Sequence, residues 1–162
     1  MLNLKAGLSG EMGEIYVLEK LYREGYIAST TPRGTKGVDI LCTNTNYDKF
    51  VAIEVKNIQE FSRKWPVKYS KSFQNLFYVF VCLNKDKSTR DYFIVPSEIV
   101  VEVIEILSKT LKRNGKPYKG GKLRKMPKFI FINPKGRFYN DRYGDRYSEE
   151  TYRNNWDLLG LK

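Results

Sequence analysis

Two β-like runs decide how this chain folds: V-D-I-L-C-T at residues 38–43 and F-V-A-I-E-V-K at residues 50–56. Both runs are rich in the branched and aromatic side chains that strands favour. The residues between them, 44–49, are polar and rich in asparagine, which is typical of a hairpin loop. The sequence therefore predicts two adjacent antiparallel strands.

Charged residues stand inside both predicted strands. The second run alternates, so its apolar residues share one face and Glu54 and Lys56 lie on the other. The first run carries a single acid, Asp39, which lies near Glu54 and Lys56 if the two strands pair. An acid in each of two neighbouring strands is unfavourable unless a cation or a metal accompanies it. The alternative is that Glu54 and Lys56 form a solvated strand face and that Asp39 is a cap near a turn.

The helix predicted for residues 9–25 contributes a third carboxylate. Ser9 can cap this helix and Gly25 ends it. Its predicted apolar face consists of Ile15, Val17, Leu18, Leu21 and Tyr22. Glu14 lies close to the middle of that face, whereas Glu11 lies further from it. A glutamate in such a position either bends out to water or points at a buried group that attracts negative charge.

Three carboxylates and a lysine together suit metal-dependent phosphoryl chemistry. Mg²⁺ is held by one or two carboxylates, with waters and phosphate oxygens as its other ligands. The bound ion polarises a phosphoryl group and lowers the pKa of a coordinated water. A lysine beside such a site can orient the attacking water or neutralise developing charge.

The overall composition agrees with this chemistry. The chain has 162 residues, enough for one domain, and its formal net charge of +11 favours a nucleic-acid partner. It contains no histidine, which excludes imidazole-based hydrolysis and histidine-ligated metal sites. Cys42 and Cys82 lie in apolar runs without a pairing pattern, so we expect reduced thiols in a cytoplasmic protein. Neither a signal peptide nor a membrane-spanning run is predicted.

The arrangement of Gly37-Val38-Asp39 followed by Glu54-Val55-Lys56 resembles the D…ExK signature of the PD-(D/E)XK, or restriction-endonuclease-like, nuclease superfamily. The upstream Gly13-Glu14 is similar to the first helix of that fold. The resemblance covers residues 7–112 and departs from the usual motif in having Val38 where a proline is expected. It implies that Asp39 and Glu54 are metal ligands together with the Val55 carbonyl. It further implies that Glu14 is an accessory ligand and that Lys56 positions the water.

The remaining elements complete a single α/β domain over residues 1–162. Strands are predicted at 77–83, 92–95 and 129–132, and a second helix begins at Ser97. The resemblance implies a restriction-endonuclease-like αβββαβ core with a mixed central sheet flanked by helices. That core spans about residues 7–112. A basic C-terminal extension and a capping helix account for residues 113–162.

The positive charge is concentrated in one segment. Residues 108–146 hold 13 Lys and Arg and two Asp, a net of +11 that equals the charge of the whole chain. This distribution predicts a phosphate-tracking surface, and the alternative is a solvated loop that aids solubility. Trp65 either stacks on a base or covers the core. The candidate nucleic-acid-binding residues are Arg33, Lys36, Lys64, Trp65, Lys68, Lys119, Lys122, Arg124 and Lys125.

These observations predict a DNA endonuclease that depends on Mg²⁺ or Mn²⁺ and hydrolyses phosphodiester bonds. A second hypothesis is a DNA- or RNA-binding protein that keeps the fold without catalysis. A third is a branched-DNA, or Holliday junction, resolvase that acts as a homodimer. The complete set of acids and lysine favours the enzyme over the binding protein.

Overall fold

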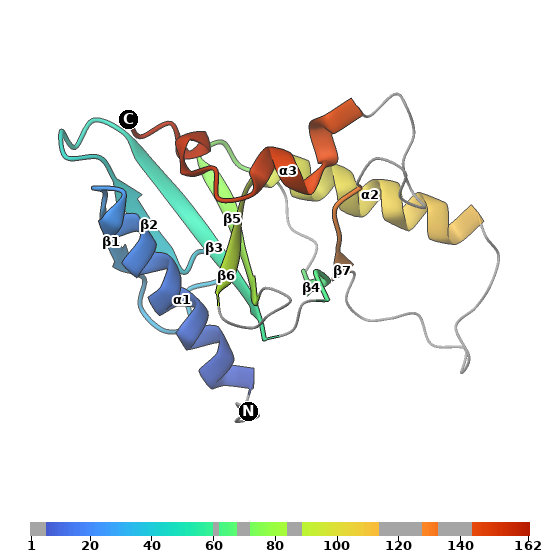
Figure 1. Ribbon diagram of the computed structural model, residues 1–162, viewed down its shortest axis with the longest axis horizontal. Helices are drawn as coiled ribbons and strands as arrows, with labels where there is room; N and C mark the ends of the chain where they lie inside the picture. The colour runs from blue at the N-terminus through green and yellow to red at the C-terminus, as the bar shows by residue number, and fades with distance from the viewer. Residues whose placement is uncertain (1–5, 60–61, 68–71, 84–88, 114–127, 133–143) are drawn as a thin grey trace.

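A five-stranded mixed sheet forms the centre of the computed structural model (Figure 1), which describes residues 6–59, 62–67, 72–83, 89–113, 128–132 and 144–162. The strand order is β1-β2-β3-β5-β6, and only the β3–β5 pair is parallel. The strands are β1 (Ile27–Thr30), β2 (Ile40–Thr43), β3 (Phe50–Ile58), β5 (Leu76–Leu83) and β6 (Arg90–Pro96). The predicted α/β fold class with a mixed sheet flanked by helices is confirmed.

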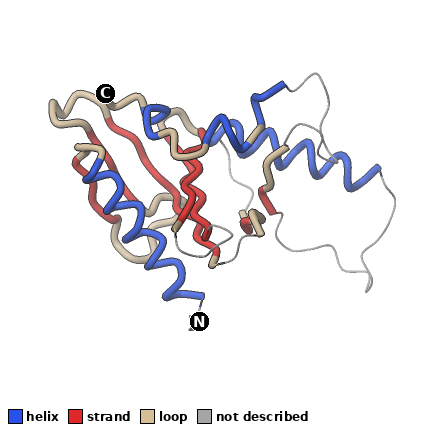
Figure 2. The backbone as a smooth tube through the Cα atoms, viewed as in Figure 1, coloured by secondary structure: helices blue, strands red, loops and turns tan. Residues whose placement is uncertain are grey.

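Helices and short segments cover both faces of this sheet (Figure 2). Helix α1 (Ala6–Arg23) and the 3-10 turn η2 (Trp156–Leu159) pack on one face. Helix α2 (Ser97–Arg113) packs on the other face, with the 3-10 turn η1 (Gly144–Tyr147) and the short helix α3 (Glu149–Tyr152). The sheet is therefore buried on both sides along β5 and β6, which explains the continuous apolar run of β5.

The predicted hairpin is confirmed. Strands β2 and β3 pair antiparallel, with Thr43 opposite Phe50 at the turn and Ile40 opposite Ile53 at the open end. The sequence pattern does not predict strand β1, because residues 29–36 have the composition of a loop. Ala28 is the only one of its four residues that is buried, so an apolar alternation is too short to be detected.

The strand predicted at 129–132 is reduced to β7 (Lys128–Phe129), which lies outside the central sheet. It pairs with β4 (Trp65–Pro66) in a separate two-stranded ribbon. The ring of Phe129 stacks on Phe80 at 4.4 Å between centroids. The apolar character of this segment therefore reflects burial of its rings against the α2 face of the sheet rather than membership of the main ladder.

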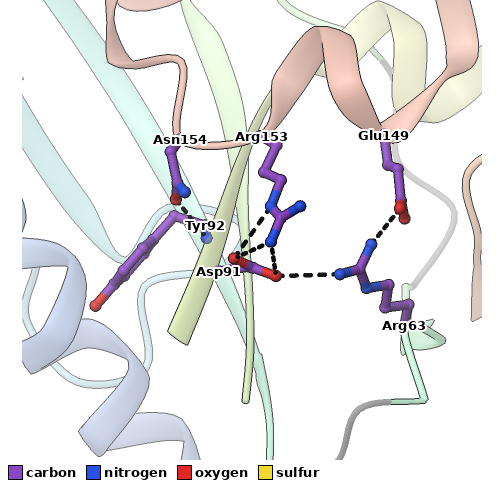
Figure 3. Close-up of polar contacts among 6 residues, drawn as sticks. All are labelled: Arg63, Asp91, Tyr92, Glu149, Arg153 and Asn154. Atoms are coloured by element: carbon purple, nitrogen blue, oxygen red, sulfur yellow. Dashed lines mark hydrogen bonds and ion pairs between the residues drawn. The ribbon is translucent and has the colours of Figure 1, made fainter. Parts of the chain in front are cut away.

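A buried ionic network ties the C-terminal segment to the edge strand β6 (Figure 3). Asp91 is 2% exposed and accepts hydrogen bonds from Arg63 at 3.1 Å and from Arg153 at 3.0 Å. Arg63 also pairs with Glu149 of α3. The network anchors the segment that follows β3 to both β6 and the predicted C-terminal cap, which α3 and η2 form.

Candidate active site

The candidate site lies where β2 begins, beside the middle of β3. The first residue of β2, Ile40, pairs with Ile53. The preceding residue, Asp39, donates its N–H to the Ile53 carbonyl, which places Asp39 next to β3 and close to Glu54, the residue that follows Ile53 in the chain. Beyond that point β5 is the strand that accompanies β3 as far as Ile58 among the described residues. The predicted neighbours Asp39, Glu54 and Lys56 therefore come from two paired strands at one position in the sheet.

Asp39 is held in place by three hydrogen bonds. Its backbone N–H donates to the Ile53 carbonyl at 2.8 Å, and its own carbonyl accepts from the Thr31 N–H at 2.9 Å. Its side-chain Oδ2 accepts from the Val55 N–H at 2.7 Å. The carboxylate thus occupies the place that a further β2 residue would take beside β3, and its orientation is fixed before any ligand binds.

Glu54 and Lys56 lie side by side on the β3 face predicted from the alternation. The Lys56 Nζ donates to Glu54 Oε1 and also contacts the Val55 carbonyl at 3.3 Å. Their side chains are 25% exposed for Lys56 and 15% exposed for Glu54. The second oxygen of Glu54, Oε2, is buried and has no hydrogen-bond partner in the described part of the chain. A buried carboxylate oxygen without a partner is energetically unfavourable, and a cation at this point would relieve the cost.

The chain approaches this oxygen at Gly37. Gly37 has φ of +79°, a conformation that side-chain-bearing residues rarely adopt. A Cβ built at this position would lie 3.9 Å from Glu54 Oε2. The glycine therefore permits the turn that leads into Asp39 while keeping the main chain close to the Glu54 carboxylate.

Glu14 of α1 lies within electrostatic reach of Asp39 and Lys56. Burial raises the pKa of Glu14, and the charges of Asp39 and Glu11 raise it further, while Arg33 and Lys56 act in the opposite direction. The residue is half-buried, whereas Glu11 is exposed and pairs with Arg33 at 2.8 Å. The helix thus places Glu14, and not Glu11, toward the site.

The buried stripe of α1 differs from the predicted apolar face. Ile15 and Tyr22 are 61% and 56% exposed, although the apolar pattern assigns both to that face. The buried residues are Gly13, Val17 and Leu21. The helix is rotated because Gly13 has no side chain and lets the backbone approach the sheet, an effect that a count of apolar residues does not register.

The donor set fits a hard divalent cation. In the described part of the chain, no three acidic, histidine or cysteine side chains form a group arranged to hold a metal. Mg²⁺ requires no such group, because one or two carboxylates suffice when waters and phosphate oxygens complete the shell. Asp39, Glu54 and the carbonyl of Val55 are oxygen donors of the kind that such a shell uses.

The predicted nucleic-acid-binding residues have different outcomes. Arg33, Lys36 and Lys64 are exposed, as contact with phosphate requires. The base-stacking role considered for Trp65 is wrong: its side chain is fully buried, and its Nε1 donates to the Val81 carbonyl at 3.0 Å. The candidates that lie outside the described residues are Lys68, Lys119, Lys122, Arg124 and Lys125.

One residue next to the site was missed by sequence reasoning. Asn57 directly follows Lys56 and lies on the α1 face of β3, where its side-chain amide donates to the Ser9 carbonyl at 2.7 Å. The available signal was a polar residue at the position where the alternation of β3 requires an apolar one.

The fold is similar to that of a solved endonuclease. A bacterial homing endonuclease, I-Ssp6803I, matches with a TM-score of 0.50 and 11% identity, over 96% of this chain and 91% of that chain. No protein-family model matches the chain, and no curated protein sequence matches it. At this identity the likeness concerns the fold alone. None of the described helices is long and apolar enough to cross a membrane.

Proposed function

We propose that this protein is a metal-dependent DNA endonuclease of the PD-(D/E)XK type. The observation that carries the proposal is the cluster at the end of the β2–β3 pairing. There Asp39 is fixed beside β3, and Glu54 keeps a buried oxygen that no described residue hydrogen-bonds. The likeness in fold to a homing endonuclease supports DNA as the substrate.

Each residue of the cluster has a separate task. Asp39 and Glu54, with the Val55 carbonyl, would hold Mg²⁺ or Mn²⁺, and Glu14 would add negative charge from α1. The bound ion supplies polarisation of the phosphoryl group and a coordinated water of lowered pKa. Lys56 is already a donor at the Glu54 carboxylate. Its ammonium orients the attacking water and offsets the charge that develops on the phosphate.

Substrate contacts are proposed for the loop that leads into Asp39. Arg33 and Lys36 are exposed on this loop and are near in sequence to the carboxylate. An exposed ion pair such as that between Arg33 and Glu11 contributes little stability, so the arginine can exchange its partner for a phosphate. Affinity for DNA should then fall steeply with salt.

Cleavage assays test the proposal. Purified protein is incubated with linear duplex, single-stranded and four-way-junction DNA in Mg²⁺, Mn²⁺ or chelator. We expect metal-dependent cleavage that Asp39→Ala and Lys56→Ala abolish. Lys49→Ala is the matched control, because Lys49 is exposed at the opposite end of β3 and contacts the Lys162 carbonyl.

Two results would redirect the proposal. Tight DNA binding without cleavage by the wild type would favour the non-catalytic binding protein. Selective cleavage of the junction by a dimer in solution would favour the resolvase.

A further inference from the structure

Helix α1 packs closely on strand β3 at Gly13. A Cβ built on Gly13 would lie 2.5 Å from the Asn57 Cβ and 3.3 Å from Val55 Cγ1. The first distance is shorter than real Cβ contacts allow, and the obstructing atom is attached directly to the β3 backbone. Alanine is otherwise the better helix former. The glycine is therefore required by the contact and not by the helix.

Asn57 supports this contact with a hydrogen bond. Its Nδ2 donates to the Ser9 carbonyl at 2.7 Å and lies 3.4 Å from the Ser9 hydroxyl. Ser9 is four residues before Gly13, so its carbonyl belongs to the same helical turn. Asn57 thus fixes the position of this turn along β3, and it does so from the residue that follows Lys56.

Glu14 is the next residue after Gly13 on the helix. Glu14 is carried by the same helical turn, so a displacement of that turn from β3 changes the position of Glu14 relative to Asp39, whose charge raises the pKa of Glu14. We propose that Gly13 and Asn57 are positioning residues that hold Glu14 beside Asp39 and so raise the affinity of the site for a divalent metal. This inference rests on the proposed function.

The test measures metal binding and not cleavage. Mn²⁺ is titrated into chelator-treated protein, and the free ion is followed by electron paramagnetic resonance. Disturbing groups that orient metal ligands typically weakens binding about 10- to 100-fold. Gly13→Ala is therefore expected to raise the Mn²⁺ dissociation constant about tenfold or more. Gly10→Ala is the matched control, because a Cβ at Gly10 of the same helix meets nothing within 4 Å.

Two double variants separate positioning from simple loss of structure. Asn57→Gly removes the Cβ that the methyl group introduced by Gly13→Ala would strike. Gly13→Ala combined with Asn57→Gly should therefore bind Mn²⁺ as well as Asn57→Gly alone. Glu14→Gln should weaken binding in the wild type and add little once Gly13→Ala has displaced the helix. If Gly13→Ala does not fold, Asn57→Ala, which removes the hydrogen bond without adding an atom, should still weaken Mn²⁺ binding.

The opposite outcomes overturn the inference. Wild-type affinity in Gly13→Ala or in Asn57→Ala shows that the contact does not act on the metal site, and equal weakening in Gly10→Ala shows a general effect on the helix. Asp39→Asn separates the two proposals. If the Asp39→Asn variant binds Mn²⁺ as tightly as the wild type does, the proposed metal site is wrong, and the inference fails with it.

Discussion

Replacing Asp39 by asparagine and by alanine separates its structural role from its chemical role. The Asp39 Oδ2 accepts the Val55 N–H at 2.7 Å, and Val55 is buried. Alanine leaves this N–H without an acceptor, which costs about 1–3 kcal/mol. Asparagine keeps a carbonyl oxygen in the same place but loses the negative charge. We therefore expect Asp39→Ala to unfold about 2–12 °C lower than Asp39→Asn, at about 2–4 °C per kcal/mol.

The cleavage activity of the two Asp39 variants should not follow the order of their stability. Both substitutions remove a charged metal ligand, so both should lose metal-dependent cleavage of DNA to a similar extent. Thermal unfolding in chelator gives the stability of each variant, and cleavage of a labelled duplex in Mg²⁺ gives its activity. Equal stability of the two variants would refute the role of the hydrogen bond. Wild-type cleavage by Asp39→Asn would refute the role of the carboxylate as a ligand.

Three further predictions concern other residues. The pKa of Glu14 is higher in the folded chain than its ordinary value of 4.5, so protonated Glu14 stabilises the folded state. This contribution to the free energy of unfolding is complete below pH 4.5 and is lost as pH rises through the raised pKa. Glu14→Gln in chelator should therefore lose less stability than the wild type with rising pH, and identical urea-unfolding profiles would contradict this. Asp91→Ala leaves two arginines facing an empty buried position and should cost about 3 kcal/mol in urea unfolding. Replacing the exposed Asp157 by alanine should cost less than about 0.5 kcal/mol, and a similar loss in both variants would show that the buried ionic network around Asp91 does not stabilise the fold. Trp65→Phe should lose about 1–2 kcal/mol with its bond to Val81 while DNA affinity, measured by fluorescence anisotropy, stays unchanged.

The sequence was sufficient for the parts of the fold that have strong local periodicity. Helices α1 and α2 carry apolar patterns that extend over more than one turn. Strands β2, β3 and β5 carry apolar patterns that extend over several residues. Strand β1 carries no such pattern, since it is a short edge strand with one buried residue. The pairing of β4 with β7 joins segments about 60 residues apart, and no local signal specifies it.

Trp65 shows why the role of an aromatic residue could not be assigned from sequence. Trp65 lies between Lys64 and Lys68. This pattern is equally compatible with a residue that contacts nucleic acid and with a core residue near the surface. Its burial depends on β7 and on the rings of Phe80 and Phe93, with centroids 5.1 and 5.7 Å away. These neighbours come from three distant parts of the chain, so only the folded structure distinguishes the two roles.

The candidate site also contains a feature that local sequence does not determine, namely the direction of the Glu14 side chain. Alternation places Glu54 and Lys56 on one strand face, and the hairpin brings Asp39 near them, because both arguments need only strand pairing and the two-residue period of a strand. The direction of Glu14 depends instead on how α1 rotates about its axis, and the rotation is set by the contact of Gly13 with Asn57. An apolar face counted by side chains gives no weight to glycine, although the absence of a side chain at Gly13 is what lets the helix pack closely on the sheet there. Glycines on helices that pack against strands should therefore be included when the inward face of a helix is predicted.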